Sequence, residues 1–293
     1  MFPETSSFDT SGASQLLQDF YATDRDSFMQ FVYESMEQQR GTTASETVTG
    51  TDGQDALDGN IVEGATEGDV LVGGAESDTY FISDDLTRVV EETGEGDWDQ
   101  VVTNRDFTLS DHINSQGQTS EIEKVVLWSD GDIDADLSAA TWNTEVYGNS
   151  GNNVLTGGTG TNGLYGGAGD DTIYGNDQTD WIADNEGNDI IYGGAGDDVI
   201  TNGAGDDTIS GGSGADEFYF DQVDGAQYDT ITDFETGVDT IYITDMDMWN
   251  FSITAVAGGT EFTYGVDRSI LIEDDVAMSD FVFLSSDAGG GGL

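Results

Sequence analysis

The chain has 293 residues, of which 60 are acidic, 6 are basic and one is a histidine, so its formal net charge is -54. This charge excludes nucleic acid and anionic membrane surfaces as electrostatic partners and favours cations. The absence of cysteine excludes disulfides and thiolate metal sites. Specific cation sites and a generally acidic surface suited to high salt both explain the acidity, and the two explanations are compatible.

Residues 1–46 are predicted to form a helical cap followed by a linker. Apolar residues recur at helical spacing within 14–40, Asp24 suits the start of a helix, and Arg40 with Gly41 suits its end. We expect this helix to cover one end of a repeat structure, with a contact for self-assembly as the alternative. The first residues lack the basic and apolar regions of a secretory signal peptide, and no apolar run reaches the roughly 20 residues of a membrane helix.

Residues 47–81 are predicted to form a short, irregular block of glycine-rich repeats. Nine-residue units begin at Gly50, Gly64 and Gly73, and a five-residue insertion after the first breaks their phase. Each unit has a carboxylate at its sixth position: Asp55, Asp69 and Asp78.

Residues 82–147 lose these glycine turns but keep strand-like segments at 88–90, 99–102 and 124–128. We interpret this part as a connector of irregular solenoid coils. His112 lies in a polar stretch, where we expect a solvated side chain, and a single histidine cannot build a multi-histidine zinc site.

Residues 148–220 contain eight consecutive nine-residue units, of which Gly166 to Tyr174, GGAGDDTIY, is the most regular. The eighth position is always apolar: Leu155, Leu164, Ile173, Ile182, Ile191, Ile200, Ile209 and Phe218. The sixth position is a carboxylate or its amide: Asn153, Asn162, Asp171, Asp180, Asp189, Asp198, Asp207 and Asp216. A disordered linker would not keep an apolar residue at every ninth position.

This period predicts a solenoid in which two units make one coil. Positions 7 to 9 form a short strand with one side chain turned inward, and positions 1 to 6 form a turn that needs glycine backbone angles. The sixth positions then stack along both edges at a strand spacing of roughly 4.8 Å. Carboxylates at this spacing repel each other, and a hard divalent cation bound by carboxylate and carbonyl oxygens removes the repulsion.

These units resemble the repeats-in-toxin (RTX) family, whose calcium-binding nonapeptide has the form G-G-x-G-x-D-x-U-x. The resemblance implies an all-β, right-handed parallel β-roll, with the short N-terminal helical segment and a β-rich C-terminal cap around it. It also implies Ca²⁺ between turns eighteen residues apart, up to six ions in the roll and one or two in the earlier block. We expect weaker sites where Asn153 lies over Asp171 and Asn162 over Asp180.

In the family, backbone carbonyls complete each site together with the two sixth-position side chains. Carried over to the Asp-over-Asp pairs, second- and fourth-position carbonyls come from the first turn: Gly167, Gly169, Asn176, Gln178, Asn185, Gly187, Gly194 and Gly196. First- and third-position carbonyls come from the second turn: Asp184, Glu186, Gly193, Ala195, Asn202, Ala204, Gly211 and Ser213. Gln178, Asp184 and Asn202 depart from the glycine pattern, which affects turn geometry more than binding, because their carbonyls would be the ligands.

Residues 221–293 are predicted to form a strand-rich cap. The segment from Asp229 to Ile241 resembles the D-x-I-x-D-F-x-x-G-x-D-x-I sequence that follows RTX rolls, and Ser279 to Leu284 resembles the terminus that type I exporters recognise. The resemblance therefore implies export to the cell surface or the extracellular space without an N-terminal signal peptide.

The sequence contains neither H-E-x-x-H nor G-x-S-x-G, and its single histidine argues against Ser-His-Asp designs, so we expect no enzyme activity. We predict a secreted calcium-binding protein that folds on calcium binding and has a structural or surface role, with self-assembly into a layer, matrix or filament. One alternative is a calcium-dependent adhesin or glycan-binding protein that uses exposed aromatic residues, with Trp98, Trp128, Trp142 and Trp249 as candidates. Another is the accessory module of an extracellular enzyme.

Overall fold

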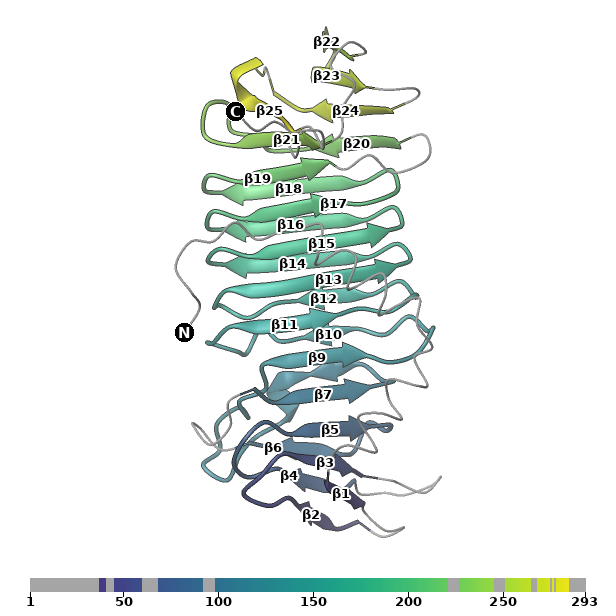
Figure 1. The fold of residues 1–293 in the computed structure, drawn as a ribbon, viewed down its shortest axis with the longest axis vertical. Helices are drawn as coiled ribbons and strands as arrows, with labels where there is room; N and C mark the ends of the chain where they lie inside the picture. Colours follow the sequence, from purple (N-terminus) through teal and green to yellow (C-terminus); the bar gives the residue numbers. More distant parts are fainter. Residues whose placement is uncertain are drawn as a thin grey trace, which may run out of the picture.

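The protein is an all-β parallel solenoid, elongated along the axis on which its coils stack (Figure 1). The computed structural model describes residues 37–40, 45–59, 68–91, 98–220, 227–244, 251–264, 268–274, 276 and 278–284. Within these residues the only helices are the 3-10 turns η1 (Leu109–Asp111) and η2 (Met278–Asp280). In the same residues, no helix is long and apolar enough to cross a membrane.

One sheet of twelve parallel strands runs the length of the solenoid. Its strands, in spatial order, are β1 (Glu37–Arg40), β3 (Asp55–Asp58), β5 (Thr79–Ile82), β7 (Gln100–Thr103), β9 (Lys124–Leu127), β11 (Thr144–Tyr147), β13 (Asn162–Ala168), β15 (Trp181–Glu186), β17 (Val199–Asn202), β19 (Glu217–Phe220), β21 (Thr240–Thr244) and β25 (Phe281–Leu284). We call it the long sheet.

The strands that alternate with these in the chain form two further sheets on the other side of the core. The short sheet contains β2 (Thr47–Thr49), β4 (Val70–Val72) and β6 (Arg88–Val90). The second long sheet contains β8 (Phe107–Thr108), β10 (Ala135–Asp136), β12 (Val154–Thr156), β14 (Thr172–Asp177), β16 (Ile190–Ala195), β18 (Thr208–Ser213), β20 (Gln227–Ile231) and β24 (Arg268–Ile272), with β23 (Gly259–Tyr264) and β22 (Phe251–Val256) added antiparallel at the end.

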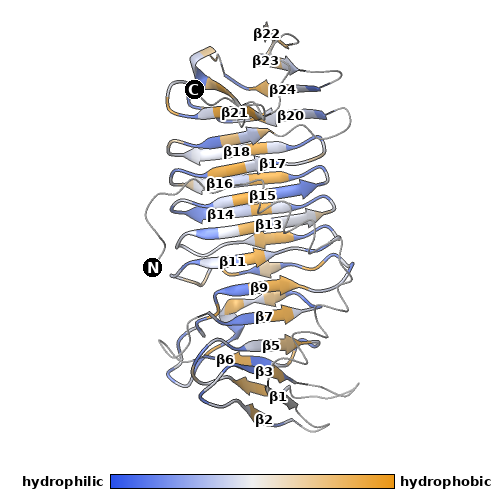
Figure 2. Ribbon diagram, in the orientation of Figure 1, coloured by the Kyte–Doolittle hydropathy of each residue, from blue (hydrophilic) through white to orange (hydrophobic). Residues whose placement is uncertain are grey.

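The core is a stack of single apolar side chains, as the nine-residue period predicts. Ile173 pairs with Ile191 between β14 and β16, and Ile182 pairs with Ile200 between β15 and β17. All eight residues at the eighth position are at most 2% exposed. Figure 2 shows the hydrophobic centres of successive strands above one another along the axis. The prediction that the side chain at the eighth position points into the core is confirmed.

The strands of the roll are longer than the three residues predicted. β14 continues past Tyr174 to Asp177, because Asn176 and Asp177 pair with Gly194 and Ala195 of β16. The first part of this predicted turn is therefore extended backbone, and the true turn between β14 and β15 is confined to residues 178–180.

The prediction of a helix over 14–40 is wrong at its C-terminal end. Residues 37–40 form strand β1, which pairs in parallel with Asp55–Asp58 of β3. The exposed edge of β3 offers backbone hydrogen bonds that override the local helix preference of this segment. Residues 14–36 lie outside the described part of the chain.

His112 is buried rather than solvated. Its ring is 7% exposed, stacks on Phe107 with centroids 4.5 Å apart, and accepts a hydrogen bond at Nδ1 from the backbone N–H of Val89 at 2.9 Å. Ser120 Oγ accepts a second backbone bond, from Glu91 N. These side chains cover the edge of β6, where the short sheet ends. Burial lowers the pKa of His112 to about 4, which keeps the imidazole neutral as the acceptor role requires.

The last coils are closed by an aromatic cluster. β20 and β21 continue the two long sheets, β24 pairs in parallel with β20, and β23 and β22 add antiparallel strands at the end. Phe262 is fully buried and stacks on Phe281 with centroids 4.8 Å apart, while Phe251 and Phe283 pack around it. Solenoid ends need such caps, because an open core would expose apolar surface.

Substitutions of the neighbouring residues Ile190 and Ile191 on β16 test whether each strand contributes one side chain to the core. Ile191 is fully buried and Ile190 is 40% exposed. Ile191→Ala is expected to lower the free energy of unfolding in saturating calcium by about 2–5 kcal/mol, because it leaves a cavity in the stack. Ile190→Ala is expected to change it by less than about 0.5 kcal/mol. Urea denaturation measures both, and equal losses would contradict the assigned core.

Candidate metal centre

The carboxylates at the sixth position link each coil to the one before it. The backbone N–H of Asp171 donates to Asp189 Oδ1 at 2.6 Å, and that of Asp189 donates to Asp207 Oδ1 at 2.8 Å. On the other edge, Asp180 N donates to Asp198 Oδ1 at 2.8 Å, and Asp198 N donates to Asp216 Oδ1 at 2.9 Å. Each donor and its acceptor are eighteen residues apart, so each edge carries a ladder of carboxylates that follows the coil period.

The second oxygen of each ladder carboxylate is buried with no hydrogen-bond donor in the described part of the structure. These atoms are the Oδ2 oxygens of Asp171, Asp180, Asp189, Asp198, Asp207 and Asp216. The residues themselves are at most 1% exposed. A buried charged oxygen without a partner is costly, so these atoms indicate a ligand that contributes positive charge.

Burial is also the largest influence on the acidity of these groups. It raises the pKa of Asp171 and Asp180 to about 8 and of Asp189 and Asp198 to about 7, and the neighbouring carboxylate along the ladder raises each further. Backbone hydrogen bonds act in the opposite direction but are outweighed. Without a cation, the ladder therefore tends to hold protons near neutral pH.

Glycine at the first position leaves room beside four of the unpartnered oxygens, those of Asp171, Asp180, Asp198 and Asp216. A Cβ on Gly193 would lie 2.5 Å from Asp198 Oδ2 and 2.5 Å from the carbonyl oxygen of Gly211 in the next coil. A Cβ on Gly175 would lie 2.5 Å from Asp180 Oδ2 and 2.3 Å from Gly193 O. Carboxylate and carbonyl oxygens thus converge on one small space, which is the oxygen-only donor set that Ca²⁺ prefers.

The residues predicted to donate second- and fourth-position carbonyls lie in stacked turns. Gly167 pairs with Asn185, and Asn176 with Gly194, across neighbouring coils. Left-handed backbone is required here, with φ of +83° at Asn176 and +69° at Gln178. Positive φ recurs at Gly167, Gly169, Asn185, Gly187, Gly194 and Gly196. The third-position residues Glu186, Ala195 and Ser213 lie in strand register, and Ala204 bridges to Glu186.

Asn162 has an amide where the other coils of its edge have a carboxylate. Its Nδ2 donates to the carbonyl oxygens of Gly158, Gly160 and Gly175 at 3.2, 2.9 and 3.1 Å, and to Asp180 Oδ1 at 2.9 Å. These oxygens come from the second, fourth and first positions and from the next sixth-position acid. The orientation of the amide is fixed because its Oδ1 accepts from Gly158 N and from Thr144 Oγ1.

Asn153 is satisfied in a similar way at the start of the other edge. Its Nδ2 donates to Ile133 O at 2.7 Å and to Asn149 Oδ1 at 3.2 Å, while its Oδ1 accepts from Asn149 N. Neither asparagine therefore presents an unsatisfied oxygen to its coil interface.

Asp184 contributes a side chain that the sequence prediction left out. Its carboxylate is buried and offers an oxygen that lies within 4.8 Å of oxygens of Asp189 and Asp207. Oδ1 of Asp184 accepts from Asn185 N and from Gly203 N, each at 2.7 Å, and Oδ2 has no hydrogen-bond partner among the residues that the structure describes. Asn202, at the same place in the next coil, is 2% exposed and also points its side chain inward.

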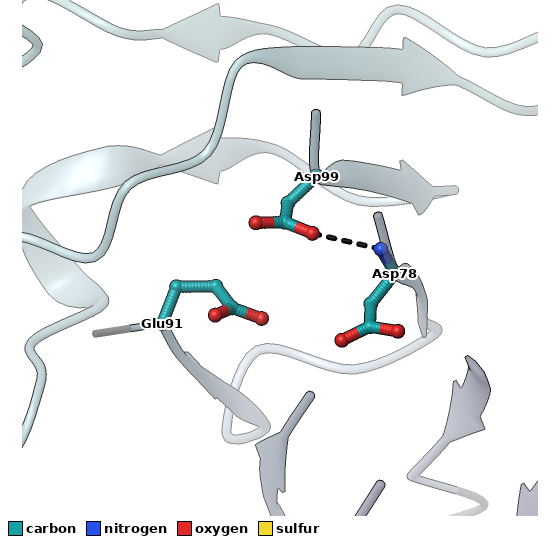
Figure 3. Close-up of side chains that lie close together, drawn as sticks. All are labelled: Asp78, Glu91 and Asp99. Atoms are coloured by element: carbon teal, nitrogen blue, oxygen red, sulfur yellow. Dashed lines mark hydrogen bonds between the residues drawn. The ribbon is translucent and has the colours of Figure 1, made fainter. Parts of the chain in front are cut away.

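The ladder continues into the N-terminal block. Asp55 N donates to Asp78 Oδ1, and Asp78 N to Asp99 Oδ1, both at 2.7 Å. Asp69 lies on the opposite edge, where its Oδ1 accepts from Glu46 N at 2.9 Å. Figure 3 shows Asp78 and Asp99 beside Glu91, which approaches from the end of the short sheet.

The structure adds Asp229 and Asp239 to the two edges of the roll. Asp207 N donates to Asp229 Oδ1 at 3.2 Å, and Asp216 N donates to Asp239 Oδ1 at 3.0 Å. Both residues begin the triplet Asp-Thr-Ile, which reproduces positions 6 to 8 of a repeat unit. That triplet is the signal that could have identified them, but the longer loops before them hide the period.

A match to a protein-family model agrees with this geometry in the roll. Residues 147–182, 174–209 and 203–225 match the RTX calcium-binding nonapeptide repeat (4 copies). Among solved structures, the AlgE6R3 subunit from the Azotobacter vinelandii mannuronan C5-epimerase is similar, with 26% identity, coverage of 42% of this chain and 83% of that chain, and a TM-score of 0.32. No curated protein sequence matches the chain.

The ladder of buried carboxylates, the glycine-lined spaces beside their second oxygens and the repeat match lead to one conclusion. Residues 147–225 are RTX nonapeptide repeats that form a calcium-binding β-roll.

Proposed function

We propose that the protein is exported and folds when it meets calcium outside the cell, where it has a structural or surface role. The observation that carries this proposal is the ladder of buried carboxylates, each with one oxygen that accepts no hydrogen bond from the described residues. In a calcium-poor compartment these charges oppose the stacking of coils, and at a net charge of -54 the chain as a whole repels itself.

Calcium binding and folding are then a single equilibrium. The site exists only where two coils are stacked, so an unfolded chain does not present it, and binding free energy is spent on folding. Extracellular modules bind calcium at roughly 10⁻⁴–10⁻³ M, a range that separates the outside of a cell from its cytosol. The bound ions supply the positive charge that the ladder lacks.

We assign the ions to pairs of stacked acids. The predicted pairs are Asp171 with Asp189, Asp189 with Asp207, Asp180 with Asp198 and Asp198 with Asp216. The same backbone-to-carboxylate hydrogen bond supports two further pairs, Asp207 with Asp229 and Asp216 with Asp239. At the pair of Asn162 and Asp180, the amide nitrogen of Asn162 takes the place of an ion, because it already donates to the oxygens that would bind one. The roll therefore begins on a coil interface that is stable without calcium.

A structural role fits a chain whose described residues are almost entirely coils and caps. The solenoid is extended, so it presents long flat faces and two ends for association with further copies. A calcium-dependent adhesin is the second candidate, favoured by Tyr174 and Tyr192. These rings stack at 5.1 Å on the outer face of the second long sheet and are 37% and 43% exposed. The tryptophans named as candidates for this role are less exposed: Trp98, Trp128 and Trp142 are half-buried, and Trp249 lies outside the described residues.

Calcium titration of the full chain from EDTA tests the proposal. Circular dichroism is expected to show a coil-to-β transition, and light scattering with negative-stain microscopy is expected to show ordered assemblies. The same transition with a monomeric product would favour the adhesin. Complete β structure in EDTA at neutral pH would contradict calcium-coupled folding and make general salt adaptation the better explanation of the acidity.

Proton binding is expected to replace calcium in part. The ladder carboxyls have folded-state pKa values raised from 3.8 to about 7 or 8, so the calcium-free roll loses stability as the pH rises from about 4 to about 8. In EDTA, β structure measured by circular dichroism should therefore increase as the pH is lowered from about 8 to about 5. In calcium the dependence should reverse, with a higher calcium midpoint at low pH, because protons compete for the same oxygens.

Asn162→Asp tests whether the amide replaces an ion. The variant loses the amide hydrogen bonds and places a carboxylate beside Asp180, so in EDTA the roll should be less stable by about 1–3 kcal/mol. In calcium it should bind one more ion, counted by native mass spectrometry.

Asn152→Asp is the matched control for this variant, because it adds the same charge at an exposed position of the neighbouring unit. It should leave the number of ions unchanged. An unchanged ion count in Asn162→Asp would show that the amide does not occupy a cation site.

A further inference from the structure

Outside the RTX repeats, three carboxylates meet in the interior of the N-terminal coils (Figure 3). Asp78 precedes β5, Asp99 precedes β7, and Glu91 follows β6. Each offers an oxygen that lies within 4.8 Å of an oxygen of the other two. All three residues are at most 2% exposed.

The group is built differently from the sites of the roll. β4 and β6 pair Val72 with Val90, so Glu91 lies in register with Gly73, the first residue of its repeat unit. On the edge of the roll that carries Asp180 and Asp198, the first position of every unit is glycine. A glycine can offer a cation only its backbone carbonyl oxygen. Glu91 instead brings a carboxylate from the short sheet toward two acids of the long sheet.

A fourth oxygen points into the same space. The hydroxyl of Tyr80 is fully buried and has no hydrogen-bond partner in the described residues. A Cβ on Gly73 would lie 2.0 Å from this hydroxyl, 2.1 Å from Asp78 Oδ2 and 2.4 Å from Glu91 Oε1. Asp78 Oδ2 likewise has no hydrogen-bond partner in the described part of the chain. A buried phenol normally finds a partner, so its orphaned hydroxyl is evidence for a ligand independent of the acids.

We propose that Asp78, Glu91 and Asp99, together with the hydroxyl of Tyr80, hold a hard divalent cation, with calcium the expected ion outside the cell. Four oxygens without nitrogen or sulfur favour Ca²⁺ over softer metals. The ion joins the short sheet to the long sheet through side chains alone. The three acids lie between β4 and β7, where coil lengths vary and the match to the nonapeptide repeat does not extend.

Burial raises the pKa of Asp78 to about 7, with the Asp99 and Asp55 carboxylates adding to the effect. This direction agrees with a group that needs a positive neighbour in order to ionise. The charge of three carboxylates exceeds that of one divalent ion, so a trivalent lanthanide should bind the same place more tightly and can serve as a probe.

Glu91→Gln in the full chain is the principal test. The amide keeps the volume of the side chain and removes one buried charge, so the variant is expected to fold. Native mass spectrometry should count one calcium fewer than in wild type. In hydrogen exchange, the peptides that cover β5 to β7 should lose their calcium-dependent protection, and the peptides that cover β14 to β18 should keep it. Glu76→Gln, at an exposed position in the turn that precedes Asp78, is the matched control and should behave as wild type.

Tyr80→Phe provides a second readout that keeps the buried ring. Terbium bound at this site should be sensitised by Tyr80, so the variant should lose a component of tyrosine-excited terbium emission that Glu91→Gln also loses. The proposal is overturned if Glu91→Gln keeps the wild-type ion count, or if Tyr80→Phe leaves the terbium emission unchanged. Because the roll is followed through its own peptides, failure of this site is distinguishable from failure of calcium-coupled folding.

Discussion

The contact on which this structure depends is the hydrogen bond from the backbone of one coil to a buried carboxylate of the next. One oxygen of each carboxylate accepts that bond and thereby fixes the distance between coils. The other oxygen remains in the interior, where the described part of the chain offers it no donor. The same residue therefore joins the coils and makes their junction unstable until a cation or a proton arrives. Calcium dependence is a direct consequence of how the coils are linked.

Departures from the repeat change what fills the space at a coil interface. With glycine at the first position, the space is left open between a carboxylate and a carbonyl oxygen, as beside Gly193. With Asn162 at the sixth position, a side-chain amide fills it. With Asp184 or Glu91 at the first position, a third carboxylate enters it. One backbone frame thus produces interfaces that range from self-sufficient to strongly cation-demanding, and their order along the axis determines where folding can begin.

A solenoid core made of one apolar side chain per strand is thin, so each coil depends on its neighbours. The stack of Ile173, Ile191 and Ile209 has no second layer behind it apart from the facing sheet. In such quasi-one-dimensional proteins, stability is a sum of interfaces between neighbours. Strengthening the edges with cations therefore affects the whole length of the roll, and the aromatic cluster around Phe262 prevents the last coil from fraying.

The sequence by itself determined the roll, because a nine-residue period leaves few ways to bury one apolar residue per unit while bringing the sixth-position acids into two columns. It also indicated calcium, through the resemblance and through the repulsion between stacked carboxylates. Only the tertiary structure decided the rest. Glu37–Arg40 became a strand because the edge of β3 was open, and His112 became buried because β6 needed a cover. Glu91 joined Asp78 and Asp99 because strand pairing across irregular coils brings together residues whose spacing in the chain follows no period.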